Sequence, residues 1–195
     1  MTVGPAPPSR ILVYGVCGSG KSALARQLAE RLDLPLYPVD DLTWEPGWVQ
    51  VPKPLQRQRI AAICDRDAWV LDAAYGNWMD VPLGSVDLIV CLDFPRWVSL
   101  SRLLRRTAGR LLARTPVCNG NRESFRMLLS KESIFRWHFT SFGRKRQRMR
   151  QWHSDPGGIQ VLLFRSPRAV TRWLRAVPPA NPAAGPGTQW GGSHR

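Results

Sequence analysis

Apolar residues follow two patterns that alternate along this chain. Short continuous runs, typical of buried strands, occupy residues 11–14, 36–39, 69–72, 86–93 and 159–164. Between the runs, apolar residues recur every three or four positions, which predicts helices at about 21–32, 54–66, 95–112 and 122–142, and a last one after Ser166-Pro167. The run at 11–14 is expected of a central parallel strand that is covered on both faces. The alternation predicts an α/β fold.

Two of the predicted helices carry apolar stripes that we expect to face the core. In the helix at 95–112, which begins at Pro95, the stripe is Trp97, Leu100, Leu104 and Leu111. In the helix at 122–142, it is Phe125, Leu128, Phe135, Phe139 and Phe142. This second helix is expected to end ahead of Gly143, where the strongly basic run 144–150 follows.

The length of 195 residues suits one domain with a sizeable core. We expect a disordered lead at 1–9, a folded domain at 10–177 and a Pro/Gly/Ala-rich disordered tail at 178–195. No run is apolar enough for a membrane span, and no signal peptide is apparent, so a cytoplasmic location is the default expectation. The four cysteines are far apart, which indicates neither a disulfide framework nor a zinc site.

The formal net charge of +14 comes almost wholly from arginine. A planar guanidinium pairs with phosphate oxygens through two hydrogen bonds, so the charge favours polyanionic partners, either nucleotides or nucleic acid. The alternative is a compositional bias of an arginine-rich proteome, which would say nothing of function.

The run at 11–14 leads into a glycine-rich turn. Residues 15–22 read G-V-C-G-S-G-K-S, the G-x-x-x-x-G-K-S pattern of a phosphate-binding P-loop, in its strand–loop–helix setting. Successive N–H groups that end at a helix N-terminus form an anion site. A nucleoside triphosphate is therefore the expected ligand, and a turn that merely joins strand to helix is the alternative. The expected binding residues are Gly15, Gly18, Ser19, Gly20, Lys21 and Ser22, with Lys21 on the β- and γ-phosphates and Ser22 on Mg²⁺.

Three of the predicted strands end in aspartates, and ligands of open α/β sheets bind at the carboxyl ends of strands. Asp40 and Asp41 are expected to touch Mg²⁺ or a phosphate acceptor, with a helix cap as the alternative. Asp72 and Asp93 each end an apolar strand, the arrangement that holds Mg²⁺ in P-loop enzymes. We expect Asp72 to be the metal-side carboxylate and Asp93 to support the site or cap a helix.

Arg102, Arg106 and Arg110 are spaced four residues apart in the helix at 95–112. Like charges at this spacing repel one another, so an anionic group is expected to compensate them. The functional interpretation is stabilisation of a phosphoryl group during transfer, and the alternative is a solvated basic face.

The order of the motifs resembles the adenylate kinase-related P-loop proteins known as topology modulation, or FlaR-like, proteins. The residues that carry the resemblance are 15–22, V-D-D-L-T-W-E-P-G-W (39–48), W-V-L-D-A-A-Y (69–75) and L-D-F-P-R-W (92–97). The resemblance covers residues 10 to about 176. It implies a P-loop nucleoside/nucleotide kinase-like three-layer fold with a five-stranded parallel sheet.

By similarity to adenylate kinases, Arg102 and Arg106 match the paired arginines that bind phosphates at the start of a lid. The resemblance implies a lid at about 107–150, in which Arg144 and Arg146 match later arginines that bind the nucleotide.

Two functions fit these features. The first is a kinase that uses ATP and Mg²⁺ to phosphorylate a small molecule or nucleotide, with Lys21, Asp40, Arg102 and Arg106 as its catalytic residues. The alternative is an ATP-dependent DNA-associated protein whose basic run contacts backbone phosphates. A GTPase switch is excluded because the chain has no N-K-x-D base-reading motif.

Overall fold

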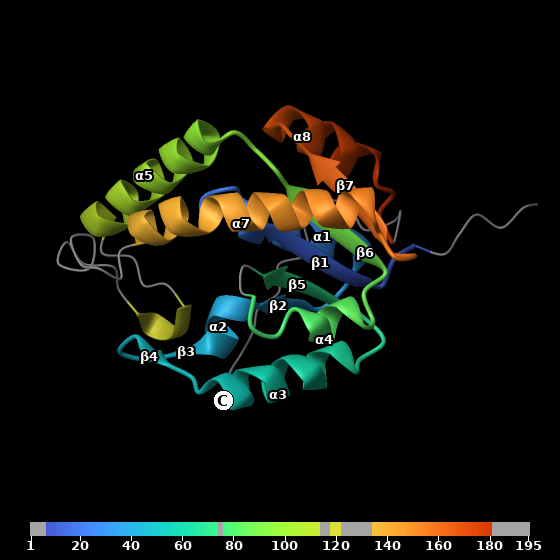
Figure 1. The fold of residues 1–195 in the computed structure, drawn as a ribbon, viewed down its shortest axis with the longest axis horizontal. Coiled ribbons are helices and arrows are strands. Elements are labelled where there is room, and N and C mark those ends of the chain that lie inside the picture. The colour runs from blue at the N-terminus through green and yellow to red at the C-terminus, as the bar shows by residue number, and fades with distance from the viewer. Residues whose placement is uncertain (1–6, 74–75, 114–117, 122–133, 181–195) are drawn as a thin grey trace, which may run out of the picture.

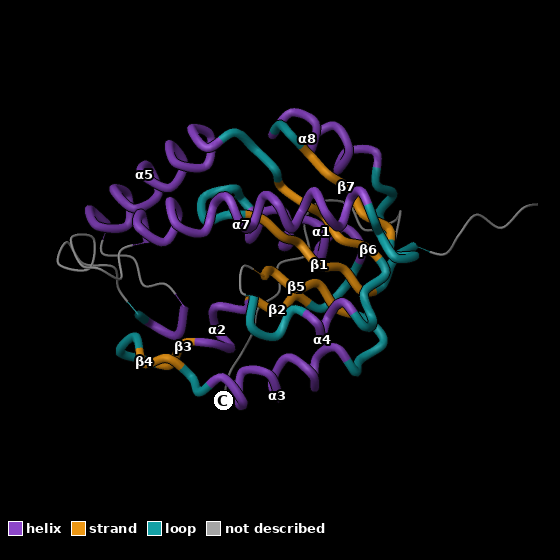
Figure 2. The backbone as a smooth tube through the Cα atoms, in the orientation of Figure 1, coloured by secondary structure: helices purple, strands orange, loops and turns teal. Residues whose placement is uncertain are grey.

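The computed structural model describes residues 7–73, 76–113, 118–121 and 134–180. Five strands form one parallel sheet in the order β2-β5-β1-β6-β7 (Figures 1 and 2). Their bounds are β1 Arg10–Gly15, β2 Leu36–Pro38, β5 Trp69–Ala73, β6 Leu88–Leu92 and β7 Gln160–Phe164. The prediction of an α/β fold with a five-stranded parallel sheet is confirmed.

Helices connect these strands, and a small antiparallel hairpin follows the second helix, α2 (Figure 1). The helices are α1 Lys21–Leu32, α2 Val39–Thr43, α3 Lys53–Cys64, α4 Asp80–Leu83, α5 Arg96–Ala113, α7 Ile134–Ser154 and α8 Pro167–Ala176. The hairpin pairs β3 (Trp44–Glu45) with β4 (Val49–Gln50), and η1 (Cys118–Gly120) is a short 3₁₀ turn.

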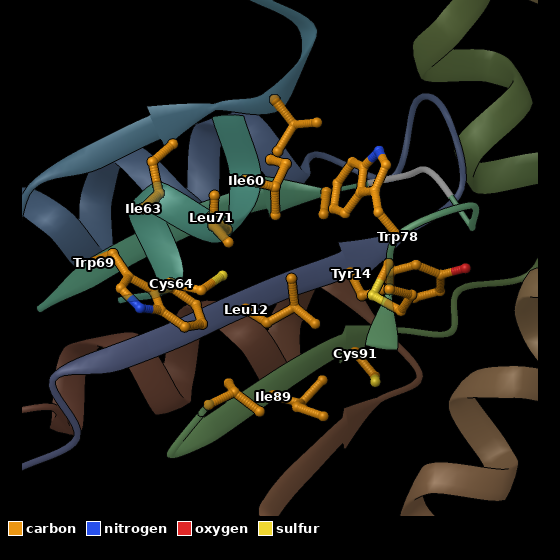
Figure 3. Close-up of a cluster of buried hydrophobic side chains, with 14 of the residues drawn as sticks. Leu12, Tyr14, Ile60, Ile63, Cys64, Trp69, Leu71, Trp78, Ile89 and Cys91 are labelled. Carbon is orange, nitrogen blue, oxygen red and sulfur yellow. The ribbon is translucent and has the colours of Figure 1, made fainter. Parts of the chain in front are cut away.

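Side chains of β1 point alternately into two hydrophobic cores. Leu12 and Tyr14 belong to a core that also contains side chains of α3 and α7 (Figure 3). Ile11 and Val13 belong to the other core, which α1 and α8 cover. All four side chains are buried, so β1 is the centre of three layers, as its continuous apolar run predicts.

The register of the sheet determines what surrounds the loop after β1. In β5, Asp72 lies opposite Val13 of β1. In β6, Leu92 lies opposite Gly15, so Asp93 follows at the level of the loop. Because all strands are parallel, both aspartates lie at the edge of the sheet where the loop turns into α1.

The course of α7 differs from the prediction. The helix does not end ahead of Gly143 but continues to Ser154, so the expected end was wrong. One glycine costs a helix only about 1 kcal/mol, and the buried residues Phe142, Lys145 and Met149 hold both sides of it in place. Phe139 is 49% exposed and does not face the core. The predicted start of this helix, with Phe125 and Leu128, lies outside the described residues.

The predicted terminal segments and lid are described only in part. Within the expected lead, the Ser9 N–H donates to Asp87 Oδ2 at 3.1 Å. Within the expected tail, the Ala180 N–H donates to the Arg31 carbonyl at 2.9 Å. Of the expected lid at 107–150, the structure describes the end of α5, residues 118–121 and most of α7.

Candidate phosphate-binding site

The loop between β1 and α1 is folded around the carbonyl of Val16. The Ser19 N–H donates to this oxygen at 3.2 Å, and so does the buried Lys21 Nζ, also at 3.2 Å. Gly20 precedes α1 with φ +96°, and no side chain caps the first turn of the helix. The N–H groups of that turn are therefore left for a ligand, which is the arrangement that binds anions.

Gly18 is needed for a reason that the sequence pattern does not contain. Its φ is +80°, and a Cβ at this position would lie 2.2 Å from the Ser99 carbonyl oxygen of α5. Helix α5 thus packs directly on the loop, and any side chain at Gly18 would push it away.

Asp72 lies beside the start of α1. The Ser22 hydroxyl acts on its carboxylate as a hydrogen-bond donor, while Asp72 Oδ1 is buried without a hydrogen-bond partner. Burial raises the pKa of Asp72, and the positive charge of Lys21 is the largest opposing cause. The charges of Asp40, which raises this pKa, and Arg106, which lowers it, also act on the carboxylate. The structure therefore brings together five of the predicted site residues.

The donor set at this place suits a hard cation. Ser22 and Asp72 offer a hydroxyl and a carboxylate, and the buried Asp72 Oδ1 lacks a hydrogen-bond donor. Mg²⁺ is bound through one or two protein oxygens, several waters and substrate phosphates. In the described part of the chain, no three His, Cys, Asp or Glu residues form a cluster that would hold a metal by themselves. The residues thus fit Mg²⁺ bound together with a phosphate ligand.

Asp93 has different surroundings. It is 2% exposed, and two guanidinium groups of α7 reach it: Arg146 Nε lies 2.8 Å from Oδ1 and Arg150 Nε lies 3.1 Å from Oδ2. Arg146 is therefore engaged with Asp93 through an ion pair. Arg144, an exposed residue two positions before Arg146 on α7, acts through its charge on Tyr14 and Lys145.

Helix α5 buries a different face from the one that the sequence predicts. Its buried residues are Ser99, Leu103 and Thr107, whereas Trp97 is 71% and Leu104 is 52% exposed. The expected stripe on Trp97 and Leu104 was wrong because the face that meets the loop must let Gly18 approach Ser99 closely. The side chain of Leu111 lies outside the described residues.

The arginine face of α5 accordingly lies against the site. Arg102 Nη1 donates to the Ser19 carbonyl at 3.1 Å, and its guanidinium lies 5.7 Å from the Phe94 ring centre. The half-buried Arg106 acts on Asp72 through its charge. The side chain of Arg110 is not among those described.

Asp40 and Asp41 lie in the first turn of the short helix α2, not at the end of a strand. Acidic groups stabilise a helix N-terminus, so the helix-end alternative also describes their position. The charge of Asp40 nevertheless acts on Asp72 and on Lys145, which places it near the loop. Burial, followed by the charge of Asp40, raises the pKa of Asp41.

Sequence reasoning missed two residues of α7 that lie over the loop. His138 is fully buried, and its Nδ1 is 3.1 Å from the Cys17 carbonyl, to which it donates. Burial lowers the pKa of His138. Lys145 follows seven residues later and is buried near Cys17 and Lys21. The signal was the stripe 138, 142, 145 and 149 on one helix face, in which polar residues alternate with apolar ones.

Within the described residues, no helix has the length and apolar character that crossing a membrane would require.

No protein-family model matches the chain, and no curated protein matches it. Among solved structures, the chain is similar to a shikimate kinase from Bacteroides thetaiotaomicron, with 15% identity, a TM-score of 0.50 and coverage of 87% of this chain and 96% of that one. It is also similar to a gluconokinase from Sinorhizobium meliloti 1021 (18% identity, TM-score 0.49, coverage 86% and 88%). A third similar structure is a deoxyadenosine kinase from M. mycoides, with 12% identity, a TM-score of 0.48 and coverage of 85% of this chain and 96% of that one.

These comparisons bear on the fold. The shikimate kinase structure and this chain share the three-layer P-loop kinase architecture with its five-stranded parallel sheet. The finer resemblance to topology modulation proteins stays a prediction.

Proposed function

We propose that this chain is a kinase that binds ATP with Mg²⁺ and transfers the γ-phosphoryl group to a small-molecule acceptor. The observation that carries the proposal is the orphaned Asp72 Oδ1 beside Ser22 and Lys21, at the end of a loop with the P-loop sequence. A buried carboxylate oxygen without a donor is costly in a structure that serves only stability. It suits a site whose ligand brings a cation.

The loop and α5 would hold the triphosphate. The open N–H groups at the start of α1 would bind the phosphate oxygens, and the Lys21 ammonium would exchange the Val16 carbonyl for the β- and γ-phosphates. Arg102 and Arg106 would balance the negative charge that develops during transfer, which also relieves their mutual repulsion.

Ser22 and Asp72 would hold Mg²⁺. When bound there, the ion would supply positive charge that neutralises the phosphate oxygens. Protonation of Asp72 would release it, and the raised pKa of this carboxyl makes the site sensitive to acid.

Asp40 would orient or deprotonate the acceptor. Its charge acts on both Asp72, the proposed metal-side residue, and Lys145 of α7, which supports this role. The fold of the chain is similar to that of a shikimate kinase, whose name implies a small acceptor, and this agrees with a hydroxyl-bearing substrate.

Contacts of the basic run favour the kinase over the DNA-associated alternative. Lys145 is buried, Arg146 and Arg150 pair with Asp93, and Arg148 acts on the Tyr14 hydroxyl. These contacts engage the four side chains within the protein, although Arg146 and Arg150 are also partly exposed. Arg144 and Arg146 remain proposed nucleotide-binding residues, for which Arg146 would have to leave Asp93.

The test is calorimetric titration of the protein with Mg-ATP and Mg-GTP, followed by a turnover screen with nucleotides, nucleosides and small alcohols. Lys21→Met should weaken ATP binding by roughly a hundredfold or more, since charge-assisted hydrogen bonds to phosphate are lost. Lys53→Met, at an exposed lysine of α3, is the matched control and should bind like the natural protein.

Failure of well-folded natural protein to bind either nucleotide would refute the proposal. Steeply salt-dependent DNA binding that survives Lys21→Met, without turnover, would support the DNA-associated alternative instead.

A further inference from the structure

Lys145 is a buried ammonium group without a hydrogen-bonding partner. Its side chain belongs to the inner face of α7, the residue is 6% exposed, and Nζ makes no hydrogen bond within the described part of the chain. The centre of the Trp137 ring lies 5.6 Å from Nζ. A lysine that serves only to fill space would direct its ammonium to solvent or to a carboxylate.

The charges that face Lys145 come from each element around the loop. They are Cys17 in the loop, Lys21 at the start of α1, Asp40 in α2 and Arg144 on α7 itself. Asp40 attracts the ammonium from a distance, but Lys145 forms no salt bridge with any described carboxylate. Lys21 and Arg144 thus add positive charge around the Lys145 ammonium, and no ion pair with a described carboxylate compensates it.

The surroundings disfavour the charged form of this lysine. Burial is the largest cause that lowers the pKa of Lys145 to about 8; Lys21 and Arg144 contribute to the lowering, while Cys17 and Asp40 oppose it. An ammonium group in such a place is held there at a cost in stability, because desolvation of a charge is not offset by a partner.

Contacts between α7 and the phosphate-binding loop fix the position of Lys145. His138, on the same helix face and seven residues earlier, donates to the Cys17 carbonyl at 3.1 Å. Phe142, between the two, is buried. The helix is therefore attached to the phosphate-binding loop just where Lys145 reaches it.

We infer that Lys145 is a second phosphate-binding lysine, whose ammonium, opposite Lys21, donates to the terminal phosphate of a bound polyphosphate. The inference rests on the proposed function and adds to it a residue that no P-loop pattern contains. The terminal phosphate is the one concerned because the groups that act on Lys145 through their charge include both Lys21 of the loop and Asp40, the proposed acceptor-side residue. A polyphosphate supplies the negative charge that the site lacks.

The stability and the affinity should respond to Lys145→Met in opposite directions. Methionine is of similar length and leaves no buried charge, so the melting temperature of the ligand-free protein should rise by roughly 2–8 °C. Affinity for inorganic tripolyphosphate and for Mg-ATP should fall by about ten- to a hundredfold. A residue with a merely structural role would lose stability and affinity together.

Polyphosphate binding should also take up a proton. Above pH 8 an increasing share of Lys145 is neutral in the free protein, and the ligand must protonate it. Affinity of the natural protein for tripolyphosphate should therefore weaken between pH 7.5 and about 9.5 more steeply than that of Lys145→Met.

The experiment titrates tripolyphosphate and Mg-ATP into the natural protein, Lys145→Met, Lys21→Met and the exposed control Lys53→Met, with melting curves for each. Binding by Lys145→Met at natural strength would overturn this inference alone, provided that Lys21→Met loses binding. Absence of binding by the natural protein would refute the proposed function as well.

A measurement on the natural protein covers the case in which Lys145→Met does not fold. Acetylation of the lysines by an amine-reactive ester at pH 8, read by mass spectrometry, should be slowed at Lys145 by tripolyphosphate but not at Lys53. Equal acetylation of Lys145 with and without tripolyphosphate would overturn the inference.

Discussion

The carboxyl ends of β5 and β6 look alike in sequence and differ in structure. Each strand is apolar and leads into an aspartate, Asp72 in one and Asp93 in the other. Asp72 faces Ser22 and Lys21 and keeps a buried oxygen without a donor. Asp93 is 2% exposed, and its Oδ1 likewise makes no hydrogen bond, but that oxygen lies 2.8 Å from Arg146 Nε in an ion pair and Oδ2 accepts from Arg150 Nε at 3.1 Å.

The difference shows that the role of an aspartate at a strand end depends on which helix packs next to it. At β5, the arriving element is the start of α1, which brings a hydroxyl and an ammonium. The second half of α7 packs over the end of β6 (Figure 1). It contributes the guanidinium groups of Arg146 and Arg150. A carboxylate with an arginine ion pair at each oxygen joins two elements, whereas one with a buried oxygen that no described side chain pairs can take a ligand.

The largest effect should come from Asp72→Asn. We expect the phosphoryl-transfer rate to fall by roughly a hundredfold or more, because a metal-bound carboxylate supports several kcal/mol of charge stabilisation. Steady-state turnover at varied Mg²⁺ concentration checks this prediction. Asp93→Asn, measured in parallel, should lose far less turnover, and a reversed ranking would assign the metal to β6.

Asp93→Asn should act on stability instead. We expect the free energy of unfolding to fall by about 1–2 kcal/mol, less than for a fully buried pair because the two arginine side chains are 38% and 51% exposed and can be hydrated. Urea unfolding at pH 7 measures the change. An unchanged midpoint would show that the two ion pairs contribute nothing.

Removal of one arginine should have a smaller effect. Arg150→Met leaves Arg146 in place, so the loss of unfolding free energy should be about 0.5–1 kcal/mol. The same holds for Arg146→Met, and the double variant should lose more than the sum if the arginines share the carboxylate. Urea unfolding of the three variants provides the cycle, and strict additivity would contradict a shared site.

The smallest expected effect is the pH dependence of the stability change caused by Asp72→Asn. Burial raises the pKa of Asp72 above its unfolded value, so the folded protein binds this proton more tightly than the unfolded chain does. Ionisation of Asp72 therefore lowers stability as the pH rises from about 4 through the folded pKa. Asp72→Asn should be more stable than the natural protein at pH 7, and the advantage should vanish near pH 4. Unfolding curves across this range would contradict the assignment if the advantage grew toward acid.

Helix α5 illustrates where the sequence could be misread. Its spacing correctly predicts a helix, but Trp97 and Leu104 lie outward while Ser99 and Thr107 are buried. A hydrophobic stripe indicates the core only if the core is what the helix packs against. Here α5 packs on the backbone of a glycine loop, which requires small and polar contacts.

Most of the fold could be predicted because it follows from local patterns. Continuous apolar runs marked the five strands, and Ser166, whose hydroxyl accepts from the Ala169 N–H at 3.3 Å, marked the start of α8. The P-loop could likewise be identified from eight consecutive residues. The short helix α2 was missed, since five residues carry too little periodicity to be distinguished from a turn.

The sequence by itself determined the succession of strands and helices along the chain, the loop with the P-loop pattern and the aspartates of the candidate site. Only the tertiary structure decided which aspartate pairs with arginines, which face of α5 meets the loop, and that His138 and Lys145 reach this loop from more than a hundred residues away. The physical reason is the distance along the chain over which each kind of interaction acts. Strand and helix signals lie within a few neighbouring residues, whereas the charge and solvation of a buried group depend on every element packed around it.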